Sequence, residues 1–372
     1  MEAVVTLLSR ARRRPSSSRS STRNSQPSSR PSSRPSSSPS SSPRSLDPTE
    51  SRPDTVSVVV CAHTTDRWDD IAAGQAALAA QTFPALERIL VIDHNPELLA
   101  RASEAFPGVR VLENAGRGGA SGARNTGIGA ATGDVVAFLD DDARPEPDWL
   151  EQLIGGYDDP AVMAVGGVAR PVWPDRRPDH MPPELDWLVG CTYLGQPTER
   201  ADVRNLWGCN MSVRRRVFDE IGGFHEDVGR IGLIPLGTEE TELCIRIAQR
   251  KPGSRIVFEP AAVVHHRVTV ARTEFAYLRS RSQAEGVSKA AMARLVGAQD
   301  ATSEESRYVR TVLTAGLRRE LGKALRGDRA GWRGARGIIT CLGTTAYWYA
   351  RGRLGHRAEV DAVALERRGR AA

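Results

Sequence analysis

Val135-Val136-Ala137-Phe138-Leu139 is an apolar run that leads directly into three adjacent carboxylates, Asp140-Asp141-Asp142. The run has the length and the β-branched and aromatic content of a buried strand. Three acids at one strand end repel one another, and a bound cation removes that repulsion. Their oxygens are hard ligands that suit Mg²⁺ or Mn²⁺. The alternative interpretation is an acidic turn whose aspartates cap a helix that starts near Asp148.

Strand and helix patterns alternate on the N-terminal side of this run. The expected strands cover residues 55–62, 89–93 and 109–112, and the expected helices cover residues 66–81, 96–105 and 120–131. Because the first strand is apolar on both faces, this order predicts an α/β fold with a doubly wound, mostly parallel sheet flanked by helices. Ligands bind such sheets at the carboxyl ends of the strands. Ala62, His63 and Asp93 stand at two of those ends.

A glycine-rich turn, Gly116-Arg117-Gly118-Gly119, follows the third expected strand. A dinucleotide-binding fingerprint would follow the first strand, so the position argues against a dehydrogenase. The glycines instead indicate a backbone that passes close to a ligand, with Arg124 available for a phosphate. The alternative for Arg124 is an ordinary charge on a helix surface.

The second half of the sheet region is less regular. We expect a helix over 148–157, a strand over 163–168, a long functional loop or lid over 170–205, a helix over 214–221, and strands over 256–258 and 262–266. The last strand ends in His265 and His266. Adjacent strand residues point to opposite faces, so at most one of the two can be a metal ligand.

A second acidic cluster begins at Thr238, which has the residue type of an N-cap. Glu239 and Glu240 would then occupy the first helical turn, where the helix dipole favours anions. The functional alternative places one of these carboxylates at the mouth of the cleft as a general base.

Charge and composition divide the chain into three parts. Residues 1–54 hold 10 Arg and 4 acids and are rich in Ser and Pro, so we expect a disordered tail. Residues 55–270 form the expected catalytic domain, and residues 271–372 form a basic helical extension with helices over 272–296 and 306–325. The middle of the chain, 55–309, is acidic, with 27 basic against 36 acidic residues. Because the basic arms lack interleaved aromatic residues, we expect no nucleic-acid partner.

The run 337–350 is apolar and aromatic, but it is shorter than the roughly 20 residues that a bilayer span needs. Arginines flank it on both sides, which is typical of a helix that lies on an anionic membrane surface. A helix docked on the domain is the alternative. The five cysteines form no CxxC pair, which favours reduced thiols in a cytosolic protein.

These motifs, in this order, resemble the inverting family 2 nucleotide-sugar glycosyltransferases, which have the GT-A fold. The resemblance covers about residues 55–270, and the helix over 284–289 is similar to actinobacterial, membrane-associated members. It implies that Ala62, His63, Asp93 and Arg124 bind the nucleotide sugar, together with Asp140 and Asp141. Asp140-Asp141-Asp142 is similar to the DxD motif, so Asp142, Asp140 and His266 would hold Mg²⁺ or Mn²⁺, with Asp142 nearest the metal.

The run 239–246 resembles the family's ED-x-x-L-x-x-R motif. Glu240 stands where the family has its catalytic Asp, and Glu239 is the competitor for this role. The longer side chain of Glu keeps the base chemistry but changes its reach. Gly208-Cys209-Asn210-Met211 is similar to an acceptor-side motif, which makes Trp207, Gly208 and Asn210 the acceptor-side candidates.

The resemblance implies a metal-dependent enzyme that moves a sugar from a nucleoside-diphosphate donor to a hydroxyl or phosphate acceptor. The basic helices beside an apolar stretch favour a lipid-linked or cell-envelope glycan as the acceptor, and a secondary metabolite is the alternative. A nucleotidyltransferase and an inactive scaffold are weaker alternatives. The first would need a glycine-rich, basic phosphate loop after the first strand, which residues 63–66 do not form, and the second would be expected to lose the carboxylates, which are present. We expect a cytoplasmic protein that is peripheral at the inner face of the plasma membrane.

Overall fold

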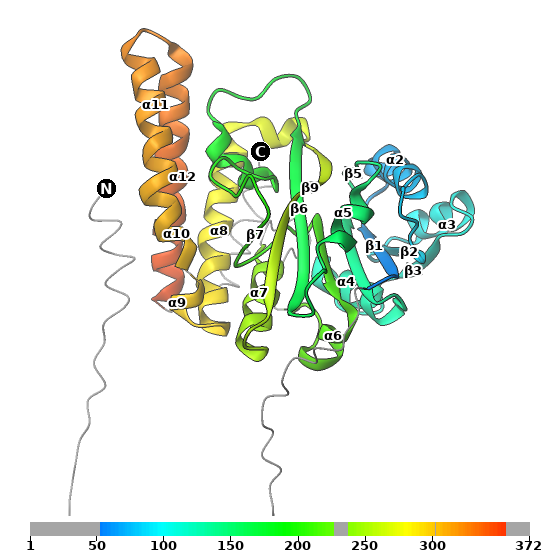
Figure 1. Ribbon diagram of the computed structural model, residues 1–372. Helices are drawn as coiled ribbons and strands as arrows, with labels where there is room; N and C mark the ends of the chain where they lie inside the picture. The colour runs from blue at the N-terminus through cyan, green and yellow to red at the C-terminus, as the bar shows by residue number, and fades with distance from the viewer. Residues whose placement is uncertain (1–52, 227–236, 302, 355–372) are drawn as a thin grey trace, which may run out of the picture.

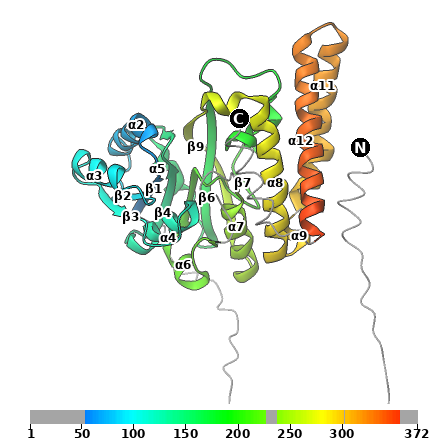
Figure 2. The same ribbon diagram turned by 180° about the vertical axis from the view of Figure 1, so that it is seen from behind.

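A computed structural model describes residues 53–226, 237–301 and 303–354. The predicted disordered tail, apart from its last two residues, and the end of the basic extension lie outside these ranges. One mixed sheet runs through the molecule, and a pair of long helices stands at one side of it (Figure 1). The view from behind shows the same order of layers, with one helix between that pair and the sheet (Figure 2).

The N-terminal half of the sheet is parallel and follows the predicted alternation. Its strands are β1 (Val56–Ala62), β2 (Glu87–Ile92), β3 (Arg110–Glu113) and β4 (Val135–Asp140), in the order β3-β2-β1-β4. The connecting helices are α2 (Trp68–Ala79), preceded by a 3₁₀ turn at Thr65–Arg67, α3 (Pro96–Ala105) and α4 (Ala120–Ala130). Cys61 pairs with Asp140 across β1 and β4, so the end of the first strand lies beside the three aspartates.

The C-terminal half of the sheet contains an antiparallel strand that the sequence pattern did not reveal. β8 (Asn210–Arg214) runs antiparallel to β4 on one side and to β6 (Val162–Val172) on the other. The two strands expected over 256–266 are one strand, β9 (Arg255–Arg267), which is parallel to β6. The short strands β5 (Ala143–Pro145) and β7 (Ala201–Asp202) pair with β9. Register pairs Leu139 with Asn210, which places the turn before β8 beside Asp140.

Both faces of the sheet are covered because alternate strand residues point to opposite sides. On one face, β1 and β4 pack with Trp149 and Leu150 of α5 (Trp149–Gly155). On the other face, Phe138 packs in edge contacts against Phe218 and Phe224, near α6 (Arg215–Ile221) and α7 (Glu239–Arg250). Burial of these apolar side chains is the main stabilising contribution to this arrangement.

The C-terminal extension is helical, as predicted, but its helices have different ends. It comprises a 3₁₀ turn (Val270–Thr273), α8 (Phe275–Leu295), α9 (Ala298–Ala301), α10 (Ser303–Tyr308), a π-helical turn (Val309–Leu313), α11 (Thr314–Leu325) and α12 (Arg329–Arg353). In the part of the chain that the structure describes, no helix is long and apolar enough to cross a membrane.

The extension and the predicted loop over 170–205 share a hydrophobic core. Leu185, Leu188 and Val189, from a 3₁₀ segment at Pro183–Val189, pack against Leu278, Leu313 and Ile338. Buried Glu184 forms an ion pair with Arg319 at 2.6 Å. The loop is therefore held in place by the C-terminal helices, and its inner side reaches the ligand pocket.

Candidate active site

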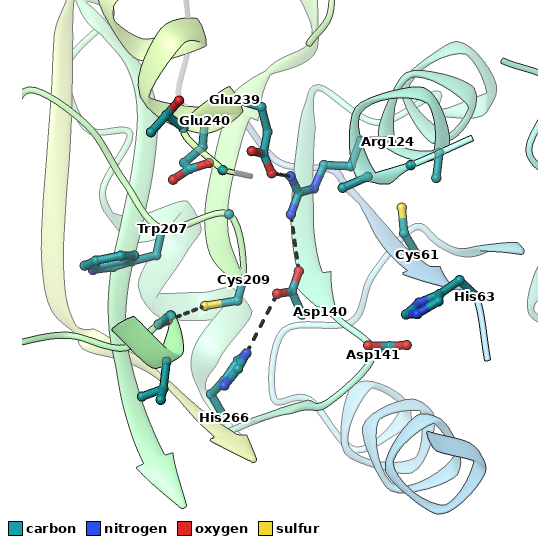
Figure 3. A pocket seen from close by; sticks show the side chains of 18 of the residues that line it. Cys61, His63, Arg124, Asp140, Asp141, Trp207, Cys209, Glu239, Glu240 and His266 are labelled. Carbon is teal, nitrogen blue, oxygen red and sulfur yellow. Dashed lines mark hydrogen bonds and ion pairs between the residues drawn. The ribbon is translucent and has the colours of Figure 1, made fainter. Parts of the chain in front are cut away.

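A pocket opens at the carboxyl ends of β1 and β4, where an α/β sheet places its ligands. Figure 3 shows Asp140 near its centre, with Arg124 and the two glutamates on one side and His266 on the other. The walls come from β1, β4, the start of α4, the turn before β8, the start of α7 and one face of α8. The predicted site residues that line it are Ala62, His63, Asp93, Arg124, Asp140, Asp141, Trp207, Gly208, Glu239, Glu240 and His266.

The three aspartates have different environments. Asp140 remains 37% exposed and faces the pocket. Asp141 is buried and accepts a short hydrogen bond from Arg67, and burial together with the charge of Asp142 raises its pKa to about 7. Burial also disfavours the charged form of Asp142, but His266 and Arg67 outweigh it and hold the pKa of Asp142 far below its usual value.

Asp142, which was expected nearest the metal, lies just behind the pocket and does not line it. Its side chain is 1% exposed and lies 3.0 Å from Arg67, 3.2 Å from His266 Nε2 and 3.7 Å from Arg272. Two guanidinium groups and an imidazole thus surround it, because an unpaired buried carboxylate would be costly. Its part in metal binding stays a prediction.

A donor set that fits a divalent cation lies next to Asp142. Asp140, Cys209 and His266 each offer one ligand atom, and these atoms lie within 4.8 Å of one another. His266 Nε2 also lies 3.8 Å from Asp140 Oδ2. A carboxylate and an imidazole are suitable ligands for Mn²⁺ or Mg²⁺, whereas the thiol of Cys209 is a softer donor. His265 points to the other face and pairs with Glu146 at 2.6 Å, as the alternation along a strand requires.

Arg124 links Asp140 at the end of β4 to the second acidic cluster. It is buried in α4, and its guanidinium donates to Glu239 Oε1 at 2.7 Å and to Asp140 Oδ1 at 3.3 Å. Charge-assisted pairs of this kind in a low-dielectric setting hold their geometry well. The surface-helix alternative for Arg124 is therefore wrong, because the side chain points into the pocket.

Glu239 and Glu240 lie at the N-terminus of α7 but differ in their partners. Glu239 is buried and paired with Arg124. Glu240 lines the pocket and forms no ion pair with the residues that the structure describes. Burial and the adjacent charge of Glu239 raise the pKa of Glu240 to about 8. A carboxylate with a raised pKa in a cleft has the properties of a general base.

Thr238 is not the side-chain cap that the sequence predicts. It has a left-handed backbone (φ 81°) and makes no capping hydrogen bond. Its buried hydroxyl oxygen has no hydrogen-bond partner in the described part of the chain. A β-branched residue is unfavourable in this conformation, and strain of this kind is common at functional sites.

At the end of β2, Asp93 fixes the glycine-rich turn. Its carboxylate accepts from Asn114 Nδ2 at 2.6 Å and from the backbone N–H of Gly119 at 2.8 Å. Gly122 lets the turn fold back onto α4, since a Cβ there would lie 1.9 Å from the carbonyl oxygen of Arg117. Asp93 thus both lines the pocket and holds one of its walls.

Of the three acceptor-side candidates, Trp207 and Gly208 line the pocket and Asn210 does not. Asn210 is fully buried, and its amide accepts from Trp149 Nε1 at 2.7 Å and donates to the backbone oxygens of Val168 and Ala262. These bonds tie β8 to β6, to β9 and to helix α5, so Asn210 holds these elements together and lies away from the pocket.

Sequence reasoning missed several residues that line the pocket. Arg67 follows the first strand by five residues, and only its pairing with Asp141 and Asp142 reveals it. Cys209 lies inside the predicted acceptor-side motif but joins the potential ligand set. Other missed residues come from the loop and the extension, and they include Trp187, Arg272, Tyr277 and Arg281. The aromatic content of the loop is the signal that could have pointed to Trp187.

The chain is similar in sequence to known proteins. The family model of glycosyl transferase family 2 matches residues 57–222. A glucosyl-dolichyl phosphate glucuronosyltransferase of Haloferax volcanii is 37% identical over 262 residues, which is 69% of this chain and 83% of that protein. A pre-mycofactocin glycosyltransferase of Mycobacterium tuberculosis is 29% identical over 190 residues, which is 48% of this chain and 37% of that protein.

A solved structure supports the fold. A mannosyltransferase from Pyrobaculum calidifontis, in complex with GDP-Man and Mn²⁺, superposes with a TM-score of 0.53 at 21% identity, covering 82% of this chain and 89% of that one. The fold is therefore GT-A, as predicted. The chain belongs to glycosyl transferase family 2, and it is a glycosyltransferase.

Proposed function

We propose that this glycosyltransferase is a metal-dependent, inverting enzyme that moves a sugar from a nucleoside-diphosphate donor to a hydroxyl group of a lipid-linked glycan. Glu240 is the general base in this proposal. The observation that carries the assignment is the contrast between Glu239, which is paired with Arg124, and Glu240, which has no cation partner in the described chain. An ion-paired carboxylate is a weak base, whereas a desolvated one is a stronger base.

The donor would occupy the side of the pocket formed by β1 and β4. Ala62 and His63 lie at the end of β1, Asp93 at the end of β2, and Asp140 at the end of β4. This side binds the nucleotide, and Arg124 holds Asp140 in place from the opposite direction. A divalent cation held by Asp140 and His266 would supply positive charge to stabilise the leaving diphosphate.

Transfer is a single displacement. The acceptor oxygen forms a bond to the anomeric carbon while the bond from that carbon to the diphosphate oxygen breaks. The electron pair leaves with the nucleoside diphosphate, and the hydroxyl proton moves to the carboxylate of Glu240. Because the two bonds lie on opposite faces of the sugar, the configuration at the anomeric carbon inverts, so an α-linked donor gives a β-linked product.

Three observations support a lipid-linked glycan as the acceptor. The H. volcanii relative, with 83% of its length covered, is named for activity on a glucosyl-dolichyl phosphate. Trp187, Trp207 and Tyr277 also line the acceptor side of the pocket, and aromatic faces are common where enzymes bind sugar rings. Arg281 adds a cation near Glu240 that an acceptor phosphate could reach. We propose a cytoplasmic protein that is peripheral at the inner face of the plasma membrane.

The test is a transfer assay with purified protein. A panel of nucleoside-diphosphate sugars is offered with Mn²⁺ or Mg²⁺ and a short-chain polyprenyl-phosphate sugar, and released nucleoside diphosphate and glycolipid product are measured. We expect one donor to support transfer, and excess chelator to stop it. Product with retained anomeric configuration, or full activity in chelator, would contradict the proposal.

The Glu240→Gln variant tests the base. The amide is nearly isosteric and cannot take a proton, so transfer should fall by roughly 10²–10⁴-fold while donor binding remains. Glu239→Gln is the matched control, since it alters the neighbouring carboxylate and should cost less activity. If Glu239→Gln were the inactive variant and Glu240→Gln the active one, the assignment of the base would be off by one residue.

A further inference from the structure

Helix α12 presents an apolar stripe on the outer side of the molecule. Trp332, Ile339 and Tyr347 are 58%, 57% and 57% exposed. Their spacing of seven and eight residues is close to two helical turns each, so they lie on one face of the helix. Figure 1 shows α11 and α12 at the outer edge of the fold, with α8 between α12 and the sheet.

The opposite face of α12 is the one that packs on the domain. A Cβ at Gly286 of α8 would lie 2.5 Å from the backbone oxygen of Thr345, and one at Gly352 would lie 2.7 Å from the Cβ of Ala290. Ile338 and Cys341 are buried in the core that the helices share with the loop. The helix therefore docks through its small and buried residues, and the exposed stripe is not part of that contact.

The charged residues of α12 itself are all positive, although the exposed Asp328 caps its first turn. Residues 329–353 contain five arginines and no acidic residue. Arg333 pairs with Asp179 at 2.9 Å, and Arg336 lies over the ring of Phe275 at 4.3 Å. Arg329, Arg353 and the nearby Arg326 are exposed, and none has an ion-pair partner within the residues that the structure covers. Free cations beside exposed aromatic side chains are complementary to a negatively charged, partly apolar surface.

We propose that this face of α12 binds a membrane surface that contains anionic lipids, with Trp332, Ile339 and Tyr347 in the interfacial layer and the arginines at the phosphate groups. Tryptophan and tyrosine are enriched at that depth of a bilayer, and each arginine adds electrostatic attraction to anionic headgroups. The choice of a lipid surface rests on the proposed function, because an enzyme that uses a lipid-linked acceptor must meet its substrate at a membrane.

The stripe and the pocket lie on opposite sides of α8. Tyr277 and Arg281 of α8 line the pocket, whereas Gly286 and Ala290 of the same helix contact α12. Lipid binding through the stripe would therefore position the enzyme without touching the donor site. It follows that changes in the stripe should alter membrane binding and leave the chemical step unchanged.

Vesicle co-sedimentation with the full chain tests this inference. The probes are vesicles of phosphatidylcholine alone and vesicles that also contain phosphatidylglycerol. The wild type should bind the anionic vesicles more tightly, and added salt should weaken the binding. Two variants are compared, W332Q/I339Q/Y347Q and R326Q/R329Q/R353Q, and each should weaken binding to anionic vesicles by at least about tenfold.

The control is Leu86→Gln, which changes a side chain that is 54% exposed in the segment before β2. It should bind vesicles as the wild type does. Circular dichroism shows whether the variants fold, and transfer to a soluble, short-chain acceptor should stay at the wild-type rate in all of them. If the wild type itself does not transfer sugar to the soluble acceptor, that result contradicts the proposed function and not the membrane inference.

Two results would overturn the inference. In the first, the apolar variant and the wild type bind both vesicle types equally. In the second, the wild type is a dimer by light scattering and W332Q/I339Q/Y347Q is a monomer, which would make the stripe an interface between two copies of this chain.

Discussion

The guanidinium group of Arg124 lies between Glu239 and Asp140, at 2.7 Å from one carboxylate and 3.3 Å from the other. Asp140 ends β4 and Glu239 begins α7, so a side chain of α4 connects elements that are 99 residues apart in the sequence. The ion pair with Arg124 neutralises Glu239, so Glu240 is the one of the two that has no direct cation partner in the described chain. This arrangement separates the roles of two adjacent acids.

The first prediction concerns the pH dependence of the wild type. Burial and the charge of Glu239 raise the pKa of Glu240 to about 8, and a general base must be ionised to act. The value of kcat/KM should therefore rise about tenfold per pH unit below that pKa and reach a plateau above it. A flat profile across the same range, measured with saturating metal, would show that a different group is the base.

The second prediction is a shift of this profile in the Arg124→Met variant. The charge of Arg124 lowers the pKa of Glu240, although burial and Glu239 act more strongly in the opposite direction. Removal of the guanidinium also leaves Glu239 unpaired, and both changes raise the pKa of Glu240. The profile should move to higher pH and activity at neutral pH should fall. Arg124→Lys keeps the positive charge and should show a smaller shift; equal profiles in both variants would contradict this account.

The third prediction separates the potential metal ligands. Asp140→Asn removes a hard oxygen ligand and should abolish Mn²⁺ binding, measured by the paramagnetic resonance signal of free Mn²⁺. Cys209→Ser should bind Mn²⁺ within about threefold of the wild type, because thiolate is not a preferred ligand of that ion. Asp69→Asn changes an exposed carboxylate in α2 and serves as the control. Loss of binding in Cys209→Ser alone would assign the site to a softer metal.

The fourth prediction concerns the contact between α12 and the loop. A Cβ at Gly337 would lie 1.9 Å from the backbone oxygen of His180, so the loop or the helix must move. Gly337→Ala should lower the free energy of unfolding by about 1–3 kcal/mol.

Gly343 is the matched control for this change in the same helix. A Cβ there meets no atom within 4 Å, so Gly343→Ala should raise the free energy of unfolding by about 0.5–1 kcal/mol. Urea denaturation of both variants checks the pair. Two destabilised variants would indicate that alanine is unfavourable in this helix for another reason, and two stabilised variants would mean that the loop contact is not tight.

Local sequence patterns were sufficient to predict the parallel half of the sheet. Each strand from β1 to β4 is a short apolar run followed by a turn and a helix, and such runs differ in period from the helices between them. The predicted ends agree with the structure within a few residues, and Pro96–Ala105 agrees at both ends. The carboxyl ends of parallel strands meet at one edge of the sheet, so the sequence alone predicts that Asp93 and Asp140 lie near one pocket.

Neither the antiparallel strand β8 nor the burial of Asn210 could be predicted from local sequence patterns. Strand direction in a sheet depends on which partner is available, and that information is non-local. Asn210 has the residue type of a ligand-binding group, but its amide is engaged by two hydrogen bonds inside the sheet and one from Trp149 of α5. The same limit applies to Thr238, whose backbone conformation is set by the surrounding chain and not by its own preference.

The sequence by itself determined the α/β fold, the strand ends that carry Asp93 and Asp140, and the acidic pair at 239–240, because these depend on short-range periodicity and residue chemistry. Only the tertiary structure decided which of the two acids is paired with Arg124. Arg124 pairs with Glu239 and Arg67 pairs with Asp142, and both contacts join residues that are far apart in the chain. Charge and burial set the pKa of a carboxylate, and both depend on neighbours that only folding brings together.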